Sequence, residues 1–130
     1  MKEVLVSAYL ATTYRVFLSD EAVDIRIGRK HRRLDELLEG RPWAFISACN
    51  PGSVLKDDNA ARHRALLDRL EGYALHPGVG IPDGEDWPPE QSVLVSGIME
   101  RDAVSIGHEF AQNAIVCGEK GQVASLVWIS

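Results

Sequence analysis

The sequence is poor in cysteine, has no long apolar run and has few basic residues in its second half. Only two of its 130 residues are cysteines, Cys49 and Cys117, and both lie in apolar, strand-like runs. Buried thiols in a reducing cytoplasm explain this pattern better than a disulfide framework does. No apolar run approaches the roughly 20 residues that cross a bilayer. The first residues lack the long apolar core of a signal peptide, so we expect a cytoplasmic protein with no membrane partner.

Charge is distributed unevenly along the chain. Residues 1–70 carry 12 Lys and Arg against 10 Asp and Glu, a net of +2, whereas residues 71–130 carry 2 against 9, a net of -7. Wrapping by nucleic acid requires a coherent positive surface, so a nucleic-acid partner is not expected for the whole domain. The basic run at 29–33 still allows a local positive patch. It lies at a predicted helix start, where positive charge opposes the helix dipole.

Signals for metals and cofactors are also missing. The four histidines show no spacing with cysteine or carboxylate partners that would form a metal site. Gly78 and Gly80 lack the strand-to-helix setting of a phosphate-binding loop. We therefore predict no metal and no cofactor.

The remaining composition is that of an ordinary soluble domain. Hydrophobic residues make up 45% and charged residues 25% of the chain, close to typical values. The length suits one domain, and no internal repeat or low-complexity linker divides the sequence. We predict a single globular domain over residues 1–130.

Hydrophobic periodicity predicts both strands and helices. Alternation predicts a hairpin from strands over 12–18 and 23–27, and the unbroken apolar run at 43–49 predicts a central strand. Further strands are expected over 92–98, 114–117 and 124–129, with a brief one at 73–76. Helices are expected over 31–38, 58–71 and 101–111, with a short one at 3–10, and residues 77–91 form a predicted Pro/Gly/acid loop. This order predicts an α+β sandwich: one mixed sheet with about three helices mainly on one face.

Five segments resemble a known family. They are Thr13–Val16, Trp43–Pro51, Asn59–Arg62, Trp87–Ser92 and Phe110–Val116. In this order they resemble a bacterial family catalogued as domain of unknown function 3293. The resemblance implies a small cytoplasmic bacterial domain, and it carries over no activity and no catalytic residue.

Polar side chains gather at the predicted ends of these elements. The candidate ligand-binding residues are Asn50, Asn59, Arg62, Trp87, Glu90, Gln112 and Asn113. They converge only if the strands at 43–49 and 92–98 are neighbours. An Arg fork beside helix N–H groups binds planar oxyanions, so Arg62 favours a small anionic or nucleotide-like ligand. Trp87 offers a flat surface and Glu90 a hydrogen-bond acceptor or general base.

Several of these candidates also have a purely structural explanation. Asn50 and Asn113 are typical of turns and helix ends, Asn59 is typical of a helix cap, and Trp87 can plug the edge of the core. No nucleophile–base pair is visible, and burial of Cys49 would raise its pKa and make it inert, so enzymatic activity stays open. The alternative function is a non-enzymatic interaction module that uses the basic patch at 29–33 to bind a protein or nucleic-acid partner. Homo-oligomer formation also stays open.

Overall fold

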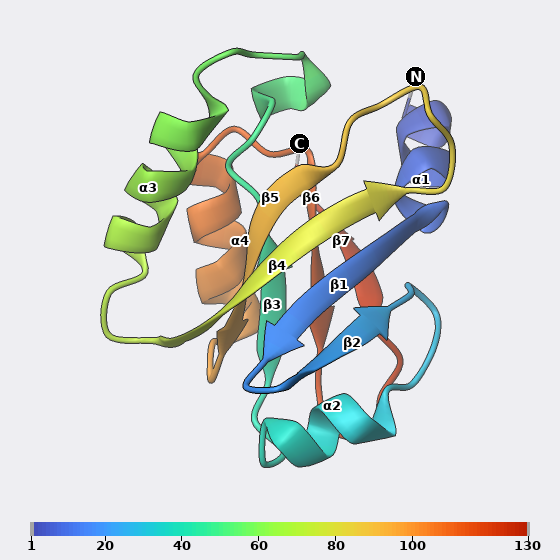
Figure 1. Ribbon diagram of the computed structural model, residues 1–130, viewed down its shortest axis with the longest axis vertical. Helices are drawn as coiled ribbons and strands as arrows, with labels where there is room; N and C mark the ends of the chain where they lie inside the picture. Colours follow the sequence, from blue (N-terminus) through green and yellow to red (C-terminus); the bar gives the residue numbers. More distant parts are fainter. Residues whose placement is uncertain (1, 130) are drawn as a thin grey trace.

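The computed structural model describes residues 2–129, which form a curled seven-stranded sheet with four α-helices (Figure 1). The elements are α1 (Lys2–Leu10), β1 (Thr12–Leu18), β2 (Glu21–Ile25), α2 (Arg32–Leu37), β3 (Trp43–Ile46), the 3₁₀ turn η1 (Pro51–Ser53), α3 (Asn59–Arg69), β4 (Ala74–Pro82), β5 (Glu90–Ser96), α4 (Glu100–Glu109), β6 (Ala114–Gly118) and β7 (Ser125–Trp128). The strands are arranged in the order β2-β1-β4-β5-β3-β6-β7. The α+β class is confirmed, and the predicted order of strands and helices is observed, including the N-terminal helix.

The strand directions differ from the mixed sheet that the sequence predicted. Every hydrogen-bonded pair among the described strands is antiparallel. Helix α3 connects β3 to β4, two strands that run in the same direction, but β5 lies between them and pairs with both. The helical connection therefore produces no parallel pair. Strands β3 and β5 are neighbours, as convergence of the candidate site required.

One face of the sheet is covered by α3 and α4 (Figure 1). The helices contribute Leu66, Leu70, Ala103 and Ile106. These side chains pack against Ala44, Ile46, Val93, Val95 and Ile115 of the central strands. Because the spacing of the helical residues places them on the sheet side of each helix, this face forms a continuous apolar core. It gives the site a rigid support from behind.

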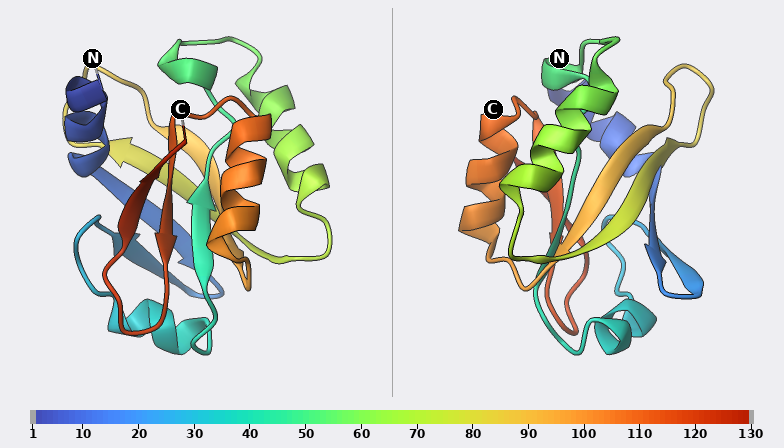
Figure 2. Two further views of the ribbon diagram at one scale, coloured as in Figure 1. Left: turned by 180° about the vertical axis from the view of Figure 1, so that it is seen from behind. Right: turned by 60° about the vertical axis from the view of Figure 1, so that its left-hand side comes forward.

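The other face lies inside the curl of the sheet and holds a second core. This core joins Tyr14, Val16, Leu18 and Ile25 with Trp43, Phe45, Leu94 and Val116. Helix α2 covers one end of the curl with Leu34 and Leu38 (Figure 2). The Gly28 N–H donates to the Ala124 carbonyl at 2.8 Å, and the Ala124 N–H donates to the Arg29 carbonyl at 2.9 Å. These bonds connect the two outer regions of the sheet and keep the curl nearly closed at the α2 end.

The predicted loop over residues 77–91 is wrong in its bounds. Strand β4 continues through Pro77 to Pro82, and β5 begins at Glu90. Pairing of β4 with β1 begins at Gly78, so Pro77 pairs only with β5. Proline lacks a backbone N–H, but at this position it removes no hydrogen bond between β4 and β1. At Gly78 a Cβ atom would lie 2.6 Å from the Phe45 ring. Glycine here is therefore required by close packing inside a strand and does not mark a loop.

The two cysteines and the lengths of the helices can be compared with what the composition predicted. Cys49 and Cys117 are both buried and unpaired, as their apolar surroundings predicted. No helix within residues 2–129 combines the length and the apolar character that crossing a bilayer requires.

Candidate functional site

The end of the curl opposite α2 contains a cavity of about 240 Å³, which we call the α1 cavity because α1 lies over it. Its floor is formed by Tyr14, Phe45 and Val116 from inside the sheet. Leu5, Ala8 and Tyr9 of α1 form one wall. Polar groups come from the ends of β3 and β5 and from the loop between β4 and β5. The cavity thus has an apolar floor and a polar rim on one side.

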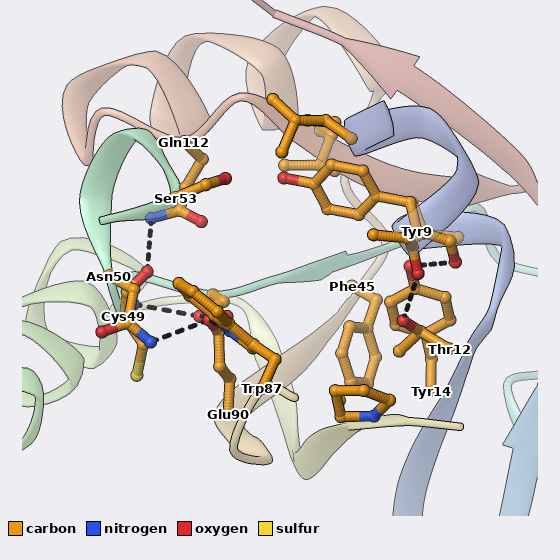
Figure 3. A pocket seen from close by; sticks show the side chains of 18 of the residues that line it. Tyr9, Thr12, Tyr14, Phe45, Cys49, Asn50, Ser53, Trp87, Glu90 and Gln112 are labelled. Carbon is orange, nitrogen blue, oxygen red and sulfur yellow. Dashed lines mark hydrogen bonds between the residues drawn. The ribbon is translucent and has the colours of Figure 1, made fainter. Parts of the chain in front are cut away.

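Glu90 is the centre of the polar rim. Its Oε2 atom accepts hydrogen bonds from Asn50 Nδ2 and from Trp87 Nε1, each at 2.8 Å, and Ser47 Oγ lies 3.3 Å from Oε1 (Figure 3). These groups meet because β3 and β5 run antiparallel with Ile46 opposite Val93. The end of β3 therefore lies beside the start of β5. Three donors hold the carboxylate in one orientation.

Asn50 is itself held by a reciprocal pair with Asn59. The Asn50 backbone N–H donates to Asn59 Oδ1, and Asn59 Nδ2 donates to Asn50 Oδ1, both at 2.9 Å. Asn50 Oδ1 also accepts the Lys56 N–H at 2.9 Å. The residue has a left-handed backbone with φ 49°, a conformation that Asn adopts more readily than other non-glycine residues. Asn50 therefore serves both the turn and the site, because its Oδ1 atom accepts the bonds of the turn while its Nδ2 group donates to Glu90.

Arg62 and Gln112 bind backbone carbonyls behind the rim. Arg62 Nε donates to the Ala48 carbonyl at 3.0 Å. Gln112 Nε2 donates to the carbonyls of Cys49 and Phe110, at 3.1 and 3.2 Å. These bonds fix the segment after β3 against the end of α4. The Arg62 guanidinium is therefore used to hold the fold and is not among the groups that line the cavity.

The seven predicted residues thus fall into two groups. Asn50, Trp87, Glu90 and Gln112 line the cavity. Asn59 and Arg62 support it from behind, and Asn113 Nδ2 donates to Ser53 Oγ at 2.8 Å, so it orients a lining hydroxyl.

Three aromatic residues of the cavity, Tyr9, Tyr14 and Phe45, are not among the residues predicted from the sequence. The Tyr14 hydroxyl donates to the Tyr9 carbonyl at 2.8 Å. The Tyr14 ring packs edge-on against the Phe45 ring, with 5.3 Å between the ring centroids. The Tyr9 ring packs edge-on against the ring of Trp128 in β7, with 6.3 Å between the ring centroids. The alternation of β1 indicates that Tyr14 faces the core, but no signal in the sequence shows that α1 folds over this end of the sheet.

The pKa values of Tyr9, Tyr14 and Cys49, which line the cavity, are raised, so that each group is neutral at physiological pH. Burial raises the pKa of Tyr9 and of Tyr14, and the charge of Glu90 adds to each shift. Burial is also the main cause that raises the pKa of Cys49, as predicted, and Glu90 again contributes. Cys49 is therefore a thiol at neutral pH, which makes it a poor nucleophile.

The loop after β4 is anchored at its first residue. Arg26 makes a bidentate ion pair with Asp83, at 3.0 and 2.9 Å, and the Asp83 N–H donates to the Ala11 carbonyl at 2.8 Å. These bonds fix the start of the loop that carries Trp87, and Trp87 itself is held by its bond to Glu90. Within residues 2–129 no three His, Cys, Asp or Glu side chains gather in a way that could hold a metal ion.

The basic segment at 29–33 lies at the α2 end, away from the cavity (Figure 1). Arg33 makes a bidentate pair with Glu21, and His31 Nε2 accepts the Arg26 N–H at 3.1 Å. The side chains of Arg33 and His31 are thus held by contacts within the domain, as is the backbone of Arg29 through its bond with Ala124.

Comparison with known proteins gives one result. A family model described as "Protein of unknown function (DUF3293)" matches residues 46–115. The matched range contains Asn50, Asn59, Arg62, Trp87, Glu90, Gln112 and Asn113, whereas α1 and β1 lie outside it. No curated protein and no solved structure matches the chain.

Proposed function

The chain belongs to the DUF3293 family, and we propose that it binds a small organic molecule in the α1 cavity. The observation that supports the proposal best is a cavity of about 240 Å³ with an apolar floor and a hydrogen-bonded polar rim. Small-molecule sites typically combine a concave apolar surface with a few fixed polar groups. The volume is below the roughly 300 Å³ at which pockets for drug-sized ligands begin. The ligand is therefore of the size of an amino acid or a single aromatic ring with a short chain.

The lining favours a ligand with a substantial apolar part. Tyr14, Phe45 and Val116 present carbon surfaces inside the curl, and burial of apolar area there is the main source of affinity. Asn50 and Glu90 fix the orientation of the ligand at the rim. The anionic class that the sequence favoured has less support, because Arg62 binds backbone carbonyls and a phosphate would meet no cation among the described lining residues.

A fragment screen tests the proposal. Wild-type protein is screened by thermal shift and ligand-observed NMR against neutral, cationic and anionic fragments, since a ligand that binds the native state raises the melting temperature. We expect hits that Gly80→Val abolishes, because Gly80 lines the cavity and a Cβ atom there meets other atoms only at 4.0 Å.

Gly84→Val is the matched control, since a Cβ atom at Gly84 meets nothing within 4 Å and Gly84 does not line the cavity. The control is expected to keep every hit. Absence of any fragment that Gly80→Val blocks, with both variants folded, would refute the proposed function.

A further inference from the structure

The charge of the α1 cavity comes from one side chain. Glu90 is the sole acidic residue that lines it, and no Lys, Arg or His of the described chain does so. Tyr9, Tyr14 and Cys49 stay neutral at physiological pH because burial raises the pKa of each. An anion that enters the cavity is therefore repelled by the carboxylate, whereas a cation is attracted.

Glu90 keeps acceptor capacity toward the cavity. Its Oε2 atom accepts two bonds of 2.8 Å, from Asn50 and Trp87, whereas Oε1 has one contact of 3.3 Å, to Ser47. Each carboxylate oxygen can accept two hydrogen bonds, so Oε1 can accept a further short one. Figure 3 shows the carboxylate between Asn50 and the indole of Trp87, at the edge of the cavity. The carboxylate is thus oriented before any ligand arrives, which lowers the entropic cost of binding.

Aromatic rings surround the space next to this carboxylate. Trp87, Tyr9, Tyr14 and Phe45 all line the cavity, and Tyr14 and Phe45 are locked edge-on at 5.3 Å. Aromatic faces attract ammonium groups and also pack well against a ligand ring. Such a lining accommodates an apolar body and a positive charge in the same molecule.

We infer that the α1 cavity recognises an organic ammonium compound: a primary amine on an aromatic or aliphatic body, with the ammonium N–H groups donating to Glu90 Oε1. This inference rests on the proposed function, since it names the chemical class of the molecule bound there. The body of the ligand packs on Tyr14 and Phe45, and the amine faces the rim.

Three probes of nearly equal size test the charge preference on the wild-type protein. They are 2-phenylethylamine, which is protonated at neutral pH, the neutral 2-phenylethanol and the anionic 3-phenylpropanoate, each titrated by NMR. The alcohol can offer the carboxylate only a hydrogen bond, whereas the ammonium group adds a charge–charge attraction to its hydrogen bond. We therefore expect the amine to bind about tenfold more tightly than the alcohol. We expect the carboxylate to bind more weakly than the alcohol. Equal affinities, or the reverse order, overturn the inference.

Glu90→Gln provides the second measurement, with Glu85→Gln as its control. Both changes remove one acidic charge from the same stretch of chain, but Glu85 is exposed and does not line the cavity. Glu90→Gln should reduce the amine affinity about tenfold and leave the alcohol affinity unchanged, while Glu85→Gln changes neither. An unchanged amine affinity in folded Glu90→Gln refutes the inference.

Salt dependence gives a test that needs no variant. Raising the ionic strength should weaken binding of the amine and not of the alcohol, and a salt-independent amine affinity counts against the ion pair. The two proposals fail in different ways. If the alcohol or other neutral fragments bind in the cavity but the amine has no advantage, only the inference about charge fails. If no fragment of any charge binds there, the proposed function fails and the inference falls with it.

Discussion

Two glycines of β4 provide a sharp test of where space exists inside the curled sheet. Gly78 and Gly80 pair with Val16 and Tyr14, so a side chain at either position points into the curl. At Gly80 a Cβ atom would have only ordinary contacts at 4.0 Å, whereas at Gly78 it would lie 2.6 Å from Phe45 Cε2 and 3.1 Å from a backbone carbonyl. The same substitution, two residues apart, should therefore change stability in opposite directions.

The expected magnitudes follow from standard contributions. Gly80→Ala stabilises by about 0.4–1 kcal/mol through the lower entropy of the unfolded chain and by about 0.8 kcal/mol through burial of one methyl group, a total of about 1–2 kcal/mol. Gly78→Ala gains the same entropic contribution of about 0.4–1 kcal/mol but has an overpacking cost of about 1–3 kcal/mol. We expect it to be destabilised by about 0.5–2 kcal/mol.

Urea unfolding followed by tryptophan fluorescence measures both changes. The comparison is valid if the m-values of the two variants equal that of wild type, since unfolding then exposes the same surface. A destabilised Gly80→Ala together with an unperturbed Gly78→Ala would show that the open space does not lie where the structure places it.

Three further predictions concern the groups that hold the site. Tyr14→Phe removes the hydrogen bond to the Tyr9 carbonyl and should cost about 0.5–1.5 kcal/mol, with faster amide hydrogen exchange in α1; unchanged exchange would argue against this anchor. Arg62→Ala should lower the urea midpoint because Arg62 donates to the Ala48 carbonyl. Arg64 is exposed on the same helix, so the free energy of unfolding of Arg64→Ala should be within about 0.5 kcal/mol of wild type. Equal effects of the two changes would contradict the structural role of Arg62. Burial lowers the pKa of His63 below 6.5, so the unfolded chain binds this proton more tightly and stability falls as the pH is lowered from about 7.5 to 5.5. His63→Leu should reduce that fall in urea midpoints, and an unchanged pH dependence would refute the assignment.

Much of the fold could be predicted because local signals agree with the final structure. The alternation over 12–18 and 23–27 and the unbroken apolar run at 43–49 each specify a strand, and β1, β2 and β3 are observed there, although β2 begins at Glu21 and β3 ends at Ile46. The helix predicted over 58–71 is observed as α3, which ends at Arg69. The exception is the stretch from Pro77 to Pro82, where proline and glycine indicate a loop but β4 continues. Gly78 is explained by the ring of Phe45, which is distant in sequence and would lie 2.6 Å from a Cβ atom there. A tertiary contact there overrides the local preference.

In the candidate site, too, some residues could be placed from the sequence and others could not. The sequence places Asn50 just after the strand at 43–49 and Glu90 in the loop before the strand at 92–98, and it leaves open whether these strands are adjacent. In the structure they are neighbours, and the Asn50–Glu90 bond is present. The role of Arg62 could not be predicted, because its carbonyl partners are exposed only by the path of the chain after β3. Tyr9 could not be placed either, since α1 has no buried residue and little amphipathic pattern. Its position over the cavity depends on contacts with β1 and β7.

Chemical-shift mapping tests the central claim, ligand binding in the α1 cavity, most directly. A ¹⁵N-labelled sample is titrated with 2-phenylethylamine or with the strongest fragment found by screening. The account predicts that the largest shifts occur at the backbone amides of Tyr9, Gly80 and Gln112 and at the indole N–H of Trp87, which donates to Glu90. Shifts confined to the α2 end and the basic segment at 29–33, with the Trp87 indole unaffected, would contradict it.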